Sequence, residues 1–363
     1  SVLNLYLQPK KSSQVNVLLG IIPAPISALG PQQRTKLLVT GDVNLLLNNS
    51  FGLGETIGLT YQKLAAGAPR LNIVYRHPYI MRSAFGADFT FEMYKRDSAY
   101  LNIDVQAGVR YQVGATQTGR VFFQHQKTNA YPDTTVVLLT KRLPGDLDMK
   151  LYNIGFGYEF NNTDYRRNPS RGYEVNLTAA FGTKKILVNT GISSLKDPAN
   201  PQFKFASLYD TVKTSTYQFK VKTSAARYFS LGKNGIVRTA ASGGLLFSQN
   251  YLRNELYQLG GYKLMRGFDE ESIFAARYAV GTVEYRYRLT GPDSYFFVFT
   301  DLGYADNKLN NAPVKHTYIG AGLGLTFATK AGLFNLSIAT GKRDDLQAGL
   351  KQTKIHFGYI NLF

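Results

Sequence analysis

The sequence predicts an all-β protein, a transmembrane antiparallel β-barrel of about 16 strands, and three observations support this fold class. Hydrophobic residues make up 44% of the 363 residues, yet the mean hydropathy is only −0.18. No run of about 18 apolar residues occurs, which excludes transmembrane helices. Many segments instead alternate apolar and polar residues, so that the apolar surface is confined to every second position, as it is in a barrel wall.

The clearest alternating segment runs from Tyr100 to Tyr111, with apolar residues at odd-numbered positions and polar residues or glycine at even-numbered ones. Similar splits recur in residues 152–160, 173–181, 217–222, 283–289 and 319–327. A soluble β-sandwich would also alternate. However, these segments reach about 10–14 residues, longer than the usual strand of about 5–6. Their polar faces are rich in Gly, Asn and charge, which suits a water-filled interior, so we favour the membrane barrel.

Sixteen strands are predicted, an even number, as bacterial single-chain barrels require. The segment from Arg70 is short, because it stops at His77-Pro78 and proline cannot donate to a strand ladder. The sixteen strands are expected to begin near Ser13, Thr35, Leu53, Arg70, Ser83, Ala99, Gly119, Lys150, Arg171, Thr211, Gly235, Arg277, Ser294, His316, Gly332 and Gln352.

The predicted connections alternate between short and long. Short turns are expected at residues 48–50, 231–234, 291–293 and 329–331, and long loops at 128–149, 184–210, 250–276, 305–315 and 342–351. In outer-membrane barrels the short turns face the periplasm and the long loops face outward. Residues 250–276 therefore form the sixth outer loop, which follows the eleventh strand.

The net charge of +18 fits either a nucleic-acid binder or a protein that contacts anionic lipid head groups and has a cationic lumen. The basic residues are spread along the chain with no basic helix and no nucleic-acid motif, so we favour the second interpretation and expect no nucleic-acid partner. Lumenal cations could form an anion path or could pair with lumenal acids. The cations are Arg110, Lys220, Lys222, Arg286 and Arg288, and the acids include Asp104, Glu159 and Glu174.

The sequence contains no recognisable catalytic set. The four histidines, His77, His125, His316 and His356, are scattered without metal-ligand spacing. No phosphate-binding loop, dinucleotide fingerprint or nucleophile elbow is present. We therefore expect neither an enzyme nor a cofactor or metal site.

One candidate site lies where the sixth outer loop meets the next two strands. The loop ends in Met265-Arg266-Gly267-Phe268, the following strand carries Glu284, and the strand after that carries Asp301 and Gly303 in an F-x-D-x-G pattern. An arginine offers five donors in a fixed fork that matches carboxylates. The pattern predicts a buried ion-pair site joining Arg266 to Glu284 and Asp301. Gly267 would permit close backbone approach, and Phe268 would pack against the wall.

A second candidate site is the seam that closes the barrel, between the first strand, residues 14–22, and the last, residues 354–363. Gly20 and Gly358 weaken regular pairing, so the seam could be a weak one. It could equally be an ordinary closed seam with an aromatic insertion signal, and the residues alone leave both open. The seam residues singled out are Val15, Val17, Leu19, Gly20, Phe357, Gly358, Tyr359 and Phe363.

The order of these motifs resembles the BamA/TamA-like superfamily of outer-membrane insertases and translocators over nearly the whole chain. Residues 265–268 match its V/L/I-R-G-F/Y loop motif, with Met for the branched residue, and Glu284 and Asp301 match its wall acids. Residues 163–172 resemble its D-x-x-x-N/F-P-x-x-G turn. The resemblance implies a long sixth outer loop folded into the lumen, pinned there by the arginine, and a lateral gate between the first and last strands.

The resemblance also implies a function, a location and partners. We expect an integral protein of the bacterial outer membrane that inserts β-barrel proteins, without chemistry or cofactor. Its partners would be nascent barrel proteins, outer-membrane lipids including lipopolysaccharide, and accessory lipoproteins or other envelope subunits. Residues 1–12 resemble a linker from an absent upstream POTRA region, and residues 13–363 would form the barrel. Alternatives are a TamA-like or two-partner-secretion translocator of the same fold, or a passive porin.

Overall fold

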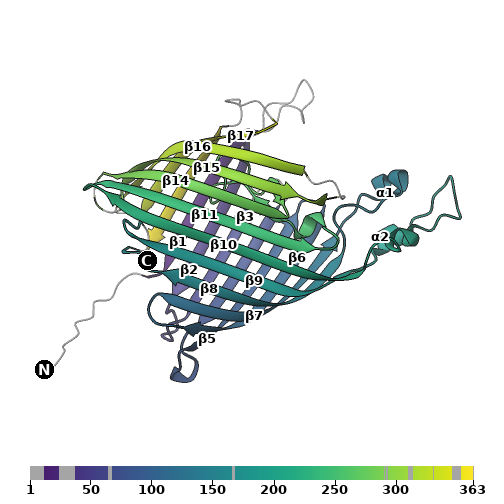
Figure 1. Ribbon diagram of the computed structural model, residues 1–363, viewed down its shortest axis with the longest axis horizontal. Coiled ribbons are helices and arrows are strands. Elements are labelled where there is room, and N and C mark those ends of the chain that lie inside the picture. The colour runs from purple at the N-terminus through teal and green to yellow at the C-terminus, as the bar shows by residue number, and fades with distance from the viewer. Residues whose placement is uncertain are drawn as a thin grey trace.

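The protein is a closed antiparallel β-barrel of sixteen strands (Figure 1). The computed structural model describes residues 12–23, 37–63, 68–165, 168–289, 291, 293–309, 314–329, 331–345 and 353–362. Each strand pairs with its neighbours in the chain, and β1 pairs with β18 to close the wall. In the described residues, no helix is long and apolar enough to cross a membrane.

The barrel strands agree with the sixteen predicted segments. The largest difference in starting position is at β10, expected near Thr211 and beginning at Ser215. The strands are β1 (Gln14–Pro23), β2 (Leu37–Asn48), β3 (Thr56–Lys63), β4 (Pro69–His77), β5 (Phe85–Arg96), β6 (Tyr100–Gln112), β7 (Gln117–Ala130), β8 (Met149–Asn161), β9 (Gly172–Ile186), β10 (Ser215–Leu231), β11 (Gly235–Ser248), β14 (Arg277–Arg288), β15 (Tyr295–Asn307), β16 (Val314–Ala328), β17 (Leu333–Arg343) and β18 (Lys354–Leu362).

The remaining elements lie in the connections between barrel strands. Between β11 and β14, the short strands β12 (Tyr257–Leu259) and β13 (Ile273–Ala275) pair with each other. The helices are α1 (Thr134–Thr140) and α2 (Thr190–Ser193), and the short 3-10 helices are η2 (Ile80–Arg82), η3 (Phe205–Tyr209) and η4 (Arg253–Glu255). Figure 1 shows α1 and α2 projecting beyond one end of the barrel. Their loops share a small apolar core that includes Val137, Ile192 and Phe205.

The wall is apolar on its outer face and polar on its inner face. In β8, Tyr152 is 46% exposed, Asn153 only 3% and Ile154 69%. Other strands repeat this arrangement, with exposed Val121 and Phe123 on β7 and buried Gln218 between exposed Tyr217 and Phe219 on β10. A soluble sandwich would bury its apolar face, so the exposed aliphatic and aromatic side chains indicate a wall that faces lipid.

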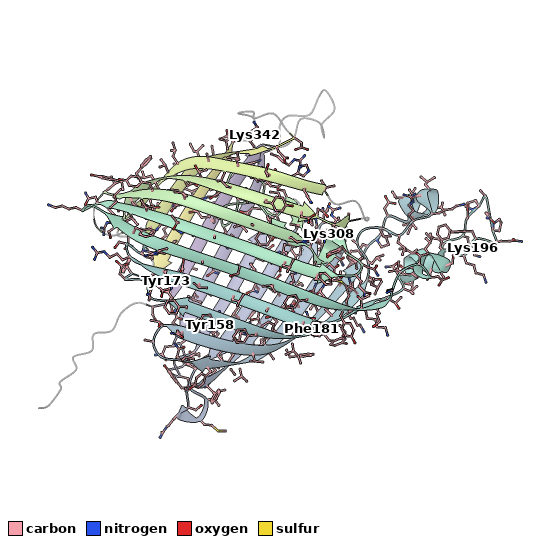
Figure 2. All side chains as sticks on the ribbon, viewed as in Figure 1. Tyr158, Tyr173, Phe181, Lys196, Lys308 and Lys342 are labelled. Carbon is pink, nitrogen blue, oxygen red and sulfur yellow. The ribbon has the colours of Figure 1, made fainter. Side chains whose placement is uncertain are left out.

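The outer face carries aromatic pairs near both ends of the barrel. Phe160 stacks on Tyr173 with ring centroids 4.8 Å apart, and Phe181 stacks on Tyr217 at 5.8 Å. Figure 2 shows Phe181 closer to the end with α1 and α2, and Tyr173 towards the opposite end. Such rings lie at the two membrane–water interfaces of a barrel. The helices lie in the long connections from β7 to β8 and from β9 to β10, so they mark the end with the long loops.

The wall is taller on one side than on the other. β10 pairs with β11 from Gln218↔Ser248 to Leu231↔Gly235. By contrast, the described pairing of β1 with β18 runs only from Gln14↔Leu362 to Ile21↔Ile355, and that of β17 with β18 from Leu333↔Ile360 to Ala339↔Lys354. The seam therefore lies within the short side of the barrel.

Candidate functional site

Arg266 lies between two carboxylates of the barrel wall, as the sequence predicts. Its Nε and Nη2 donate to both oxygens of Asp301 at 3.0 and 2.9 Å, and its backbone N–H donates to Oδ2 of the same residue at 3.0 Å. Its Nη1 donates to Oε2 of Glu284 at 2.5 Å. Asp301 thus receives the guanidinium in a two-bond fork, the arrangement that suits arginine and a carboxylate.

This ion-pair site is largely closed to water and has further supports. The side chains of Arg266, Glu284 and Asp301 are 11%, 6% and 2% exposed. The guanidinium lies 3.5 Å from the ring centroid of Phe299, a close cation–π contact. Thr282 donates its hydroxyl to Asp301 at 2.8 Å. Because every charge has several partners, the burial cost of the ions is offset by directed contacts.

The neighbours of Arg266 in the loop fit closely against the wall. Gly267 has φ +95°, and a Cβ there would lie 2.5 Å from the backbone of Thr340. Phe268 packs edge-on against Tyr318 with centroids 5.4 Å apart. Met265 is buried and covers Gly303, where a Cβ would meet its sulfur at 2.6 Å. Both positions therefore require glycine for the same reason, because the loop approaches the wall too closely there for a Cβ.

A line of glycines on the inner face of β16 makes room for the site. A Cβ at Gly320 would stand 2.1 Å from the carbonyl oxygen of Arg266. At Gly322 and Gly324 it would meet the rings of Phe299 and Phe297 at 2.6 and 2.3 Å. These glycines alternate with outward apolar residues, so the sequence places them on the inner face, but it does not reveal what occupies the space above them.

Replacing Gly320 with alanine should displace the arginine without removing it. The backbone of Arg266 must shift, and overpacking of this kind costs about 1–3 kcal/mol. We expect a lower urea midpoint for unfolding and faster proteolysis of residues 249–276. Gly281→Ala is the matched control, because a Cβ at Gly281 meets nothing within 4 Å. Equal effects of the two substitutions would contradict the proposed fit.

Residues 251–276 are anchored to strands in several parts of the wall, which the sequence does not predict. These contacts join residues as far apart as 221 positions in the chain, and only isolated charges on the inner faces hint at them. The anchors are Lys263–Asp42 of β2, Glu271–Arg70 of β4, Gln258–Tyr100 of β6, Tyr257–Val221 of β10, Tyr262–Asn335 of β17 and Asp269–Lys354 of β18.

The start of this segment is held by a fully buried ion pair. Lys184 of β9 and Glu255 of η4 are 0% and 1% exposed, with the ammonium 3.0 Å from both carboxylate oxygens. Lys184 also donates to Ser248 at 2.7 Å, and Gln218 donates to Glu255 at 2.7 Å. Removing one partner of such a pair leaves an uncompensated buried charge, so this pair fixes the start of the segment against β9, β10 and β11.

The seam between β1 and β18 is closed in this structure, and regular pairing continues through both of its glycines. Gly20 pairs with His356, and Gly358 pairs with Leu18. Val15, Val17 and Leu19 share the outer face with Phe357 and Tyr359, because Val17 pairs with Tyr359 and Leu19 with Phe357. Phe363 lies outside the described residues. Opening of the seam stays a prediction.

The predicted turn at residues 163–172 is organised by Asp164. Its carboxylate accepts from Ser170 N and Oγ at 2.8 and 2.6 Å and from Arg171 N at 3.1 Å. Partial burial would raise the pKa of Asp164, but these hydrogen bonds hold it below its ordinary value. Within the turn, Asn168 accepts from Nη1 of Arg286 at 2.8 Å. Since Nε of Arg286 donates to Glu284 at 2.7 Å, the turn is linked to the Arg266 site.

Several lumenal cations have acidic partners. Arg110 lies 2.9 Å from Glu159 and 3.6 Å from Asp88, and Arg286 pairs with Glu284. Lys220 donates to the carbonyl oxygen of Glu255 and lies over the ring of Tyr257, while Arg288 donates to the carbonyl oxygen of Lys233. Asp104 accepts from two glutamines, and Glu174 accepts from Tyr228. These contacts favour a polar structural lining over an open anion path.

One group of described residues has the spacing of metal ligands, His316, Asp344 and Asp345, with ligand atoms within 4.8 Å of one another. These atoms already have protein partners. Asp344 accepts from Thr317 N at 2.9 Å and lies 2.8 Å from the His316 ring, while Arg343 pairs with Asp345. The group is therefore satisfied as an ion-pair cluster.

Comparison with known proteins places the barrel in a family. The sequence profile of the Omp85 superfamily domain matches residues 49–359. No curated protein shows significant sequence similarity to the chain.

Solved barrels of similar shape include BamA from Haemophilus ducreyi lacking POTRA domains 1–3, with a TM-score of 0.61 and 14% identity, covering 97% of this chain and 71% of that one. CdiB from Acinetobacter baumannii gives 0.62 and 14%, covering 98% and 61%, and CdiB from Escherichia coli gives 0.59 and 14%, covering 98% and 64%. This chain thus spans less than two thirds of either CdiB chain. At this identity the likeness concerns the fold alone.

Proposed function

Because this chain belongs to the Omp85 superfamily of the outer membrane, we propose that it inserts β-barrel proteins into that membrane through its β1–β18 seam. The seam would open sideways and pair its exposed edges with an incoming strand. The free energy would come from folding of the client into lipid, with no cofactor and no chemistry. Nascent barrel proteins would be its substrates, and accessory envelope subunits its partners.

The observation that carries this proposal is the set of anchors of residues 251–276. They reach β2, β4 and β6 on one side of the wall and β10, β14, β15, β17 and β18 on the other. A segment that touches strands around the whole circumference must cross the interior. We infer that the sixth outer loop is folded into the lumen and obstructs it, so the seam is the more accessible route for a client.

The short ladders beside the seam support the same proposal. Opening β1 from β18 breaks only the described pairing from residue 14 to 21, whereas opening β10 from β11 would break the pairing from residue 218 to 231. Each lost backbone hydrogen bond leaves polar groups facing lipid, at a cost that rises with the number broken. The seam is therefore among the least costly places to open this wall.

Export of a polypeptide through the lumen is the second candidate, and one observation favours it. A polar cavity of about 410 Å³ remains beside the loop, lined by amides such as Asn102 and Gln124 and by charged residues such as Asp104, Lys220 and Lys222. Amide and charged side chains would suit the polar backbone of an extended peptide. Movement of residues 251–276 out of the lumen would enlarge this path.

Depletion of the protein followed by proteomics of the outer membrane separates the candidates. An insertase predicts loss of many barrel proteins from the membrane, because each needs the seam. Loss of a single exported partner, with barrel proteins unchanged, would contradict insertion and support export. An unchanged membrane with altered solute permeability would contradict both and leave a passive porin.

A further inference from the structure

The outer face of β7, β8 and β9 changes character in three successive rows towards the end of the barrel with the long loops. The lowest row is Phe123↔Ile154↔Phe181, directly paired across the three strands, and these side chains are 50–69% exposed. The next row is His125↔Tyr152↔Thr183. The His125 and Tyr152 rings stack with centroids 4.5 Å apart. This order matches the passage from hydrocarbon to the membrane interface.

The third row consists of three lysines, Lys127↔Lys150↔Lys185, again directly opposite one another. Lys127 and Lys185 are exposed and Lys150 is partly exposed. Directly opposed side chains have Cβ atoms about 4.5–5.5 Å apart, and like charges there destabilise a sheet. Three adjacent cations in one ladder therefore call for an anion from outside the protein.

The surrounding residues do not supply that anion. In the described part of the chain, no carboxylate lies within 4.0 Å of the ammonium group of any of these lysines. The acid nearest to Lys150 in the chain is Asp148, which precedes β8, and its carboxylate accepts from Ala130 N at 2.6 Å and from Asn189 at 2.7 Å. At the two ends of the row, Lys127 pairs with Ile103 and Lys185 with Ser215, so neither end of the row faces an acid.

We propose that Lys127, Lys150 and Lys185 form a binding site for the phosphate-bearing head group of an outer-leaflet lipid. The row lies one layer above the interfacial ring pair, where lipid phosphates are found. Strands are about 4.8 Å apart, so the row spans about 10 Å across three strands. That width suits a head group with two phosphates, while the exposed Ile154 and Phe181 beneath it offer a surface for acyl chains.

The site also assigns an orientation to the barrel in the membrane. The three strands continue directly into the loops that carry α1 and α2 (Figure 1). A lipid held by the lysines would fix the depth at which the tall side of the barrel sits in the membrane. This side lies opposite the short ladders near the seam. The site is separate from the Arg266 site and does not depend on the route taken by a client.

The test uses purified protein in a neutral detergent, titrated with bisphosphorylated lipid A, with native mass spectrometry and thermal unfolding as the two measurements. In the triple variant Lys127→Gln/Lys150→Gln/Lys185→Gln we expect affinity to fall about fivefold for each lysine removed, and roughly a hundredfold in total. Lipid A should raise the Tm of the wild type but not that of the triple variant. Without lipid, the triple variant should have the higher Tm, because the repulsion is gone.

The matched control is Lys196→Gln/Lys204→Gln/Lys233→Gln, which removes the same charge from exposed lysines in the loops and in a short turn. It should keep the affinity and Tm shift of the wild type. Equal loss in both triple variants would overturn the proposal, because binding would then follow net charge. An unchanged affinity in the first triple variant would also overturn it, as would a Tm shift produced equally by inorganic phosphate.

Discussion

Arg266→Ala should destabilise the barrel by about 3–5 kcal/mol, the usual cost of removing one partner from a buried ion pair. The carboxylates of Glu284 and Asp301 would then lie close together without the guanidinium between them, in a site that is closed to water. We expect a lower urea midpoint for unfolding, faster proteolysis within residues 249–276, and loss of client insertion. Arg266→Lys should recover little, because an ammonium cannot make the two-bond fork with Asp301.

A double-substitution cycle separates this ion pair from general damage. Arg266→Met combined with Asp301→Asn removes both charges, so its cost should be smaller than the sum of the single costs, by a coupling of about 0.5–3 kcal/mol. Glu284 retains Arg286 as a second partner, so Glu284→Gln should be milder than Asp301→Asn. Additive single effects would contradict a direct pair between Arg266 and Asp301.

A disulfide across the seam should abolish client insertion and be reversed by a reductant. Leu19 and Phe357 face each other on β1 and β18, and directly opposite residues are about 4.5–5.5 Å apart at Cα, within the range for a disulfide. The chain has no cysteine, so Leu19→Cys/Phe357→Cys introduces the only two thiols. The measurement is the rate of insertion of a barrel protein into vesicles that contain the variant.

A second crosslink from position 357 serves as the control, because Phe357 also faces Leu336 of β17. Leu336→Cys/Phe357→Cys crosslinks the adjacent ladder and leaves the seam free. We expect this variant to insert clients at the rate of the wild type, oxidised or reduced. If the oxidised seam variant also worked normally, insertion through β1 and β18 would be ruled out.

The wall could be predicted from the sequence because its signal is local. Alternation with period two assigns each residue of a strand to a face, and the structure has Tyr152 and Ile154 outward and Asn153 inward. The length and number of such segments, with turns of alternating length, then give the number of strands and the side of each loop. These features depend only on neighbouring residues, so one sequence is sufficient.

The loop anchors could not be predicted because their signal is not local. The Arg266 site could be predicted, because the sequence shows its motif and the carboxylates on the next two strands. Lys184 and Glu255 look like ordinary charges, although both are fully buried. Arg70 and Glu271, 201 positions apart, meet only because the barrel closes and residues 251–276 reach β4. A strand pattern gives the face of Arg70 but not the residue that comes to meet it.

The anchors of residues 251–276 differ in strength on the two sides of the seam, the β1 side and the β18 side. Towards β18, the segment is held by the buried Arg266 fork and by backbone packing of Gly267 on β17. Towards β1, it is held at β2 by a bridge from Lys263, which is 67% exposed, to Asp42, and such exposed bridges contribute little. If the seam opens, we expect the segment to stay with β17 and β18 and to release β2 first, while Glu271 still holds Arg70 of β4. The two edges offered to a client would then differ in rigidity, because the β18 edge keeps its support and the β1 edge loses its nearest one.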